Sequence, residues 1–221
     1  MKKYLLILLF FPTLIFAQEV KLRTDGRSSE IVKEAVGKAE KIVNELSLKD
    51  IQKKENAQNV IANRYMELAD IYKAYGKRND AITKLGLDKQ TQDQKLEESY
   101  YQTNSDLYRS RFGYISWLSF YLTEKQIDQV KNKMTEDMMT DRYNYFLELL
   151  PQMTKAQKHR VYSWLVEARE FSIDFDTPRK MRQMFTKYRG RINNYLSSCG
   201  YDVSSADKVL KEKKLKQKNK K

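Results

Sequence analysis

IVKEAVGKAEKIVNEL, residues 31–46, places apolar side chains at the three- and four-residue steps of an amphipathic helix. Similar spacing returns along the chain, and each stripe predicts a helix with one face in a core. The further stripes are Ile51, Ala57, Val60, Ile61, Tyr65, Leu68, Ile71, Tyr72 and Tyr75; Tyr101, Tyr108, Phe112, Ile115 and Leu118; Val161, Trp164, Leu165 and Ala168; and Phe185, Tyr188, Ile192, Tyr195 and Cys199.

Residues that favour turns are scarce, with seven glycines and three prolines in 221 residues, and no stretch alternates as a strand would. The sequence therefore predicts an all-α fold, a single-domain helical bundle over residues 18–207. The polar segment 77–94, which Gly86 interrupts, is expected to be a loop or a weak short helix.

The N-terminus has the three regions of a secretory signal peptide: Lys2 and Lys3, an apolar run from Tyr4 to Phe16, and Ala17 at the cleavage position. The run is too short to span a bilayer, which takes about 20 residues. No cysteine follows it, so a lipoprotein is not expected. We expect residues 1–17 to be removed and the protein to be periplasmic or secreted.

Charge is concentrated at the C-terminus. The formal net charge is +13, and removal of residues 1–17 lowers it to +11. Residues 208–221 hold eight lysines and one glutamate, so +7 lies in this tail and +4 in residues 18–207. Such a tail is expected to stay solvated or to fray from a helix end, and it offers contact with an anionic envelope surface. Export argues against nucleic acid as a partner.

Helix starts have local signals. Ser47 with Asp50, Thr123 with Gln126 and Thr154 with Gln157 each fit a capping box, in which a hydroxyl precedes an acid or amide by three residues. Thr177 followed by Pro178 predicts another start, and Pro151 the end of the preceding helix.

Residues with catalytic chemistry are sparse. His159 is the single histidine and Cys199 the single cysteine, so neither a histidine-based metal site nor a Ser–His–Asp arrangement is expected within one chain. No phosphate-binding glycine loop is present, and we expect no cofactor. Glu167 and Glu170 share a helix face by their spacing, which leaves acid-based hydrolysis open.

The segment 185–196 divides a helix into two faces. Tyr188, Ile192, Tyr195 and Cys199 form the face expected in the core, and Lys187, Arg191, Asn194 and Ser198 form the other. Gly190 is unfavourable in a helix by about 1 kcal/mol, which suggests a closely approaching backbone or ligand. Two readings stay open: the polar face fixes helix packing, or it binds a polar ligand.

At these residues the sequence resembles the bacterial family labelled domain of unknown function 3826. The residues that carry the resemblance are 187–197 (KYRGRINNYLS), 200–202 (GYD), 164–170 (WLVEARE), Pro151, Thr154, Gln157, Leu122, Thr123 and Gln126. The resemblance covers roughly residues 32–202 and implies an exported, sugar-binding protein. Asn132, Lys133 and Glu136 depart from the family's aspartate, glycine and tyrosine, and Phe146 replaces another tyrosine, so an altered activity is implied if that motif belongs to a site.

A looser resemblance connects the Leu-Thr-x-x-Gln helix starts with periplasmic chaperones of the Spy and CpxP type. Three functions therefore remain: non-catalytic carbohydrate binding, which we favour; a chaperone or stress adaptor; and a carbohydrate-active hydrolase or lyase using Glu167. For the first, Lys187, Arg191 and Asn194 would supply polar contacts, with Tyr143 or Trp164 as a stacking surface. We expect Glu167, Arg169 and Asn193 to support these residues without contacting the ligand directly.

Overall fold

A computed structural model describes residues 19–218, and the predicted signal peptide at residues 1–17 lies outside this range. The described residues form eight α-helices and no strand, which confirms the all-α prediction. None of these helices combines the length and the apolar character needed to cross a membrane.

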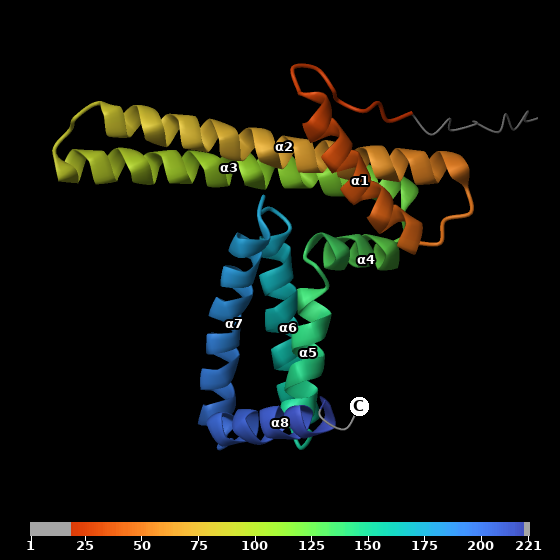
Figure 1. Cartoon of the computed structure of the whole chain (residues 1–221), viewed down its shortest axis with the longest axis vertical. Helices are drawn as coiled ribbons and strands as arrows, with labels where there is room; N and C mark the ends of the chain where they lie inside the picture. Colours follow the sequence, from red (N-terminus) through yellow and green to blue (C-terminus); the bar gives the residue numbers. More distant parts are fainter. Residues whose placement is uncertain (1–18, 219–221) are drawn as a thin grey trace, which may run out of the picture.

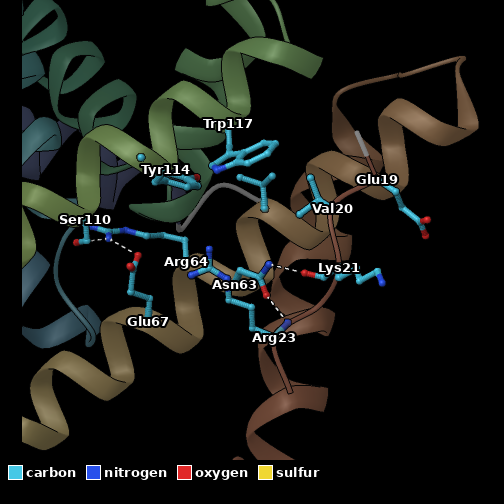
Figure 2. A pocket seen from close by; sticks show the side chains of 12 residues that line it. Glu19, Val20, Lys21, Arg23, Asn63, Arg64, Glu67, Ser110, Tyr114 and Trp117 are labelled. Atoms are coloured by element: carbon cyan, nitrogen blue, oxygen red, sulfur yellow. Dashed lines mark hydrogen bonds and ion pairs between the residues drawn. The ribbon is translucent and has the colours of Figure 1, made fainter. Parts of the chain in front are cut away.

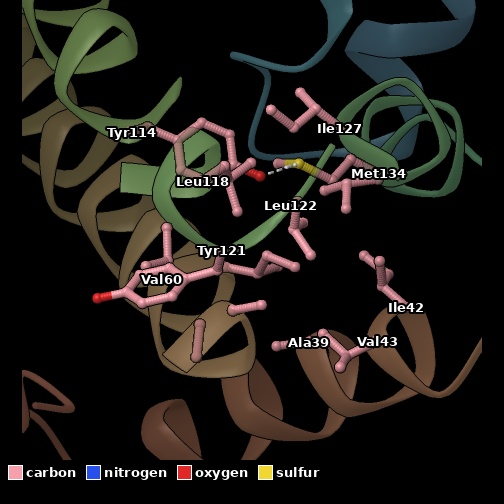
Figure 3. Packing of buried hydrophobic residues seen from close by; sticks show 14 of the residues in the cluster. Ala39, Ile42, Val43, Val60, Tyr114, Leu118, Tyr121, Leu122, Ile127 and Met134 are labelled. Carbon is pink, nitrogen blue, oxygen red and sulfur yellow. Dashed lines mark hydrogen bonds between the residues drawn. The ribbon is translucent and has the colours of Figure 1, made fainter. Parts of the chain in front are cut away.

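The first four helices are built around a long hairpin (Figure 1). They are α1 (Ser29–Glu45), α2 (Ile51–Lys84), α3 (Lys89–Tyr121) and α4 (Glu124–Met134). In the hairpin α2 and α3 lie side by side, α1 crosses α2, and α4 packs near the end of α1. Ala39, Val60, Leu118 and Ile127 belong to the core that these helices share (Figure 3). Full burial of such an aliphatic side chain contributes about 1.5–3 kcal/mol.

The last four helices extend away from the hairpin and enclose a second core. They are α5 (Met138–Leu149), α6 (Lys155–Ser172), α7 (Pro178–Ser198) and α8 (Val203–Lys218). Leu165, Phe185, Ile192 and Leu196 are fully buried there. Ile173, in the α6–α7 loop, instead belongs to the first core, so this loop connects the two halves.

The prediction for residues 77–94 was wrong. Helix α2 continues to Lys84, α3 begins at Lys89, and only a short connection with Gly86 at φ +62° lies between them. The polar composition suggested a loop, but the two helices of this part of the hairpin are joined by polar contacts. Arg78 donates to Thr103 Oγ1 at 2.7 Å, and the Ser99 hydroxyl donates to Asn79 at 2.7 Å.

Two of the three predicted capping boxes are confirmed, at Thr123–Gln126 and Thr154–Gln157. Thr177 caps α7 with Pro178 in the first turn, as predicted, and α5 ends at Leu149, before Pro151. The Ser47 box was wrong, because the Asp50 side chain caps α2 by accepting from the Lys53 amide and Ser47 adopts φ 52°.

Part of the predicted core is on the surface. Tyr101, Tyr108 and Phe112 are more than half exposed. Leu118 is buried as predicted, and α3 also buries Thr103, Leu107, Tyr114 and Tyr121. Cys199 is exposed at the end of α7, and Ile51 is 73 % exposed at the start of α2. These positions keep helical spacing, yet they are exposed within the described residues 19–218.

The lysine-rich tract continues α8 as far as Lys218. Its residues 211–217 are exposed, whereas Leu210 is buried in the second core. The predicted boundary between Asp207 and Lys208 therefore falls within one helix. Buried apolar contacts fix the N-terminal part of this helix to the second core.

Candidate functional site

A cavity of about 800 Å³ lies where α3 meets the second half of the molecule. We call it the α3–α7 cavity. It is lined by Tyr100, Asn104, Leu107, Tyr108 and Arg111 of α3, Glu167 and Phe171 of α6, Asp174 and Phe175 of the α6–α7 loop, and Met184, Lys187, Tyr188 and Arg191 of α7.

Three of the residues singled out in the sequence meet in this cavity: Lys187, Arg191 and Glu167. Arg191 Nη1 donates to Glu167 Oε2 at 3.2 Å, and both side chains are about half exposed. Burial, and next the Glu167 carboxylate, raise the pKa of Tyr188 to about 12. Lys187 has no hydrogen bond or ion pair within residues 19–218, so its ammonium group is free to bind a ligand.

Other predicted site residues lie elsewhere. Asn194 is exposed and Asn193 partly buried, and neither lines this cavity. Trp164 is no open stacking surface, because the Arg191 guanidinium lies 4.5 Å from its ring centre and the Tyr195 ring contacts it edge-on at 5.2 Å. Tyr143 packs edge-on against Tyr162 on the side of α5 and α6.

Arg169 and Glu170 face α4 and not the cavity. The buried Arg169 donates to Asp128 and to Asn132 Oδ1, both at 2.8 Å, and Lys131 pairs with Glu170 at 2.9 Å. Glu167 and Glu170, three residues apart in α6, therefore pair with different neighbours, Arg191 and Lys131. Three positions that depart from the family pattern, Asn132, Lys133 and Glu136, lie at the α4–α5 junction, and the fourth, Phe146, lies in α5; none of them lines the cavity.

The aromatic surfaces of the cavity were missed in the sequence. Tyr100 is 52 %, Tyr108 61 % and Phe171 47 % exposed, and the hydroxyls of the two tyrosines make no hydrogen bond in the described chain. Tyr108 is oriented by Phe112, whose ring meets it edge-on at 4.8 Å. Asn104 is likewise exposed and unpaired within residues 19–218. Stacking surfaces and free polar groups thus share one cavity.

One wall of the cavity is a buried ion-pair network. Asp174 accepts from Arg64 Nη2 at 2.8 Å and from Arg111 Nε at 2.8 Å, and Arg64 also donates to Glu67 and Ser110. Asp174 lies in the loop between α6 and α7, and arginines occupy both of its carboxylate oxygens.

Comparison with known protein families gives a match to "protein of unknown function (DUF3826)" over residues 32–216. The chain belongs to this family. No curated protein matches it. The matched range includes every lining residue of the α3–α7 cavity, so the cavity lies within the DUF3826 region.

This DUF3826 protein has a second cavity, of about 460 Å³, between α2, α3 and the extended segment 19–23 (Figure 2). Three asparagines of α2 hold the segment. The Val20 amide donates to Asn56 Oδ1, the Asn59 amide group donates to the Val20 carbonyl, and Asn63 binds both the Lys21 carbonyl and the Arg23 amide. Trp117 lines one side, and Arg64 lies at the wall shared with the ion-pair network.

Two further expectations can be compared with the structure. Within residues 19–218 no group of three or more histidine, cysteine or acidic side chains is arranged to hold a metal ion. Of the two explanations proposed for Gly190, the closely approaching backbone was wrong, because a Cβ atom at this position would meet no atom of residues 19–218 within 4 Å; the ligand stays a prediction. No neighbouring backbone therefore requires a glycine there.

Proposed function

We propose that this protein binds a saccharide or similar polyol, without catalysis, in the α3–α7 cavity. The observation that carries the proposal is the combination of half-exposed aromatic rings with unpaired polar side chains in one cavity. Its volume of about 800 Å³ is within the range of small-molecule sites, roughly 300–1,000 Å³.

Aromatic rings with one open face suit the apolar C–H surface of a sugar ring, and tyrosine adds a hydroxyl at its edge. Tyr100 and Tyr108 are on α3, while Phe171 is on α6, so rings approach the cavity from two elements. A ligand between them would cover apolar surface that is now in water.

The polar groups would fix the ligand's orientation. Lys187 and Asn104 supply donors that no protein group uses in the described chain. Arg191 and Glu167 pair with each other at the surface, where the pair can open toward hydroxyl groups at small loss of free energy, since an exposed ion pair contributes about 0–1 kcal/mol.

We also propose that the protein acts outside the cytoplasm. The proposal rests on the signal-like residues 1–17. Fractionation of producing cells, with N-terminal sequencing of the exported protein, should give a chain that begins at Gln18. A cytoplasmic chain that begins at Met1 would contradict it.

Calorimetric titration with a panel of neutral and acidic oligosaccharides tests the binding proposal. Tyr108→Ala should weaken binding about tenfold or more, since loss of a well-packed ring removes at least 1.4 kcal/mol. Phe120→Ala is the matched control, because this residue of α3 is exposed but outside the cavity. The proposal fails if no oligosaccharide binds, or if both variants bind as the wild type does.

A chaperone surface is the second candidate, and the exposed aromatic residues of α3 favour it. Tyr101, Phe112 and Phe120 are more than half exposed and lie outside the α3–α7 cavity. A client-binding surface would suppress aggregation at near-stoichiometric ratios, and Phe112→Ser with Phe120→Ser would abolish the suppression. Tyr108→Ala together with these variants therefore separates the two functions.

A further inference from the structure

A third cavity, of about 360 Å³, lies between α5, α7 and α8 in the second half of the molecule. We call it the α5–α8 cavity. Met138 and Phe146 supply its apolar wall, and Arg142, Arg189 and Lys211 supply cationic groups from three different helices.

Arg142 is the unusual member of this set. Its Nε atom is buried without a hydrogen-bond partner, and the side chain makes no hydrogen bond or ion pair within residues 19–218. The guanidinium lies 5.6 Å from the ring centre of the buried Phe185, which holds it in place. Burial, followed by the charge of Arg189, lowers the pKa of Arg142. A partly buried cation without a partner is unfavourable, and an anion would relieve it.

Arg189 adds a second unpaired guanidinium, since it too makes no hydrogen bond or ion pair in the described chain. Two carboxylates line the cavity and must be considered. Asp207 accepts from the Tyr145 hydroxyl at 2.5 Å and from Lys211 Nζ at 2.6 Å, so its charge is already compensated. Asp141 is exposed in the first turn of α5, and its charge reaches Arg142 without forming an ion pair.

We propose that the α5–α8 cavity binds a tetrahedral oxyanion, the phosphate or sulfate group of a small ester or of a lipid headgroup, through Arg142 and Arg189. Guanidinium groups bind such oxygens in pairs of parallel hydrogen bonds. A volume of about 360 Å³ leaves room beside the anion for the group that carries it, against Met138 and Phe146. This site is independent of the saccharide site proposed above.

Thermal unfolding and calorimetry of the purified protein test the proposal, with inorganic phosphate, inorganic sulfate and phenyl phosphate as probes and chloride at matched ionic strength as reference. Phenyl phosphate carries no sugar, which keeps the result separate from the α3–α7 cavity. At about 100 times its Kd, a bound anion should raise the Tm by at least roughly 5 °C.

Arg142→Gln and Arg189→Gln should each weaken binding by about 10- to 100-fold, as expected for the loss of charge-assisted hydrogen bonds. Arg179→Gln is the matched control, because it removes an equal charge from α7 outside this cavity. In phosphate-free buffer Arg142→Gln should melt no lower than the wild type, since it removes an unpaired charge. This shows that the variant is folded.

Sedimentation with phosphatidylglycerol vesicles distinguishes the sources of the anion. Vesicle binding that Arg142→Gln abolishes, together with phosphate binding, supports the site and assigns a lipid headgroup to it. Vesicle binding without any free-anion binding overturns the proposal, because surface lysines then suffice. Absence of anion binding, or equal weakening in Arg179→Gln, also overturns it.

Discussion

Arg64 Nη2 donates a hydrogen bond of 2.8 Å to Asp174 Oδ1, although 110 positions separate the two residues in the sequence. Arg64 is 1 % exposed, and its charge is balanced inside the protein. The pair fastens the α6–α7 loop to the α2–α3 hairpin, with Arg111 on the second oxygen of Asp174. This contact fixes how α3 stands against α7 and therefore sets the shape of the α3–α7 cavity.

Asp174→Ala should destabilise the protein by about 3 kcal/mol, because it removes the buried counter-charge of Arg64 and leaves this guanidinium with only the more exposed Glu67 as ion-pair partner. Urea unfolding at neutral pH measures the loss. Asp176→Ala is the control in the same loop, since Asp176 only pairs with Lys180 at i+4 and should contribute about 0.5 kcal/mol or less. An equal loss of unfolding free energy in both variants would show that the buried ion pair does not stabilise the fold more than an exposed one.

Asp50→Ala should lower the free energy of unfolding by about 1 kcal/mol, because the Asp50 carboxylate accepts from the Lys53 amide at 3.0 Å and caps α2. Ser47→Ala should stay within about 0.5 kcal/mol of the wild type, since Ser47 caps no helix. Chemical denaturation of the two variants compares them directly. The reverse order would restore Ser47 as the cap that the sequence pattern predicts.

The helix starts that could be predicted depend on local contacts only. Thr123 and Thr154 each bind an amide three residues ahead, and the glutamine there binds back, so the whole motif is visible within four residues. Ser47 fits the pattern equally well, but α2 begins three residues later, where Asp50 accepts from the Lys53 amide. The sequence does not show which of two neighbouring N-cap candidates is used, because the choice depends on the direction from which the chain enters the helix.

The site was only partly predictable because its two sides are far apart in the sequence. Lys187 and Arg191 were found from the polar face of α7. Tyr108 was assigned to the core, since aromatic residues at helical spacing usually pack inward. In the structure α3 turns Thr103 and Leu107 toward the interior and leaves Tyr108 outside. One signal could have indicated exposed aromatic residues: α3 carries more large apolar residues than one helix face can bury.

Asn63→Ala should loosen the segment 20–23, because Asn63 provides two of the four hydrogen bonds that tie it to α2. Trypsin should then cleave after Lys21 and Arg23 about tenfold faster, as expected when local opening becomes easier by about 1.4 kcal/mol. Glu55→Ala, an exposed change on the same helix, is the control. Unchanged cleavage would mean that the segment is held by other contacts.

Alkaline pH should destabilise the protein through its partly buried tyrosines. Burial, and next the Asp207 carboxylate, raise the pKa of Tyr145 to about 12, and Tyr188 has a similar value. The folded state therefore keeps protons that the unfolded chain loses near its ordinary pKa of 10.0. This contribution is complete below pH 10 and is lost as the pH rises toward 12. Tyr145→Phe with Tyr188→Phe should flatten the fall in unfolding free energy over this interval, whereas an unchanged slope would assign it to other groups.

Gly190 and Gly200 should respond in opposite ways to alanine. Gly190 lies within α7 with open space around its Cα atom, so Gly190→Ala should stabilise the protein by about 0.5–1 kcal/mol through helix propensity. Gly200 ends the same helix at φ +91°, where its amide donates to the Ser197 carbonyl and the Tyr201 amide to the Leu196 carbonyl.

Because an L-residue rarely adopts that φ, Gly200→Ala should destabilise the protein by more than about 1 kcal/mol. Denaturant unfolding of both variants at one pH gives the comparison. If Gly190→Ala instead destabilised the protein, the conclusion that α7 has open space at this position would be wrong. The glycine would then be needed for a contact that forms only with a bound ligand or partner.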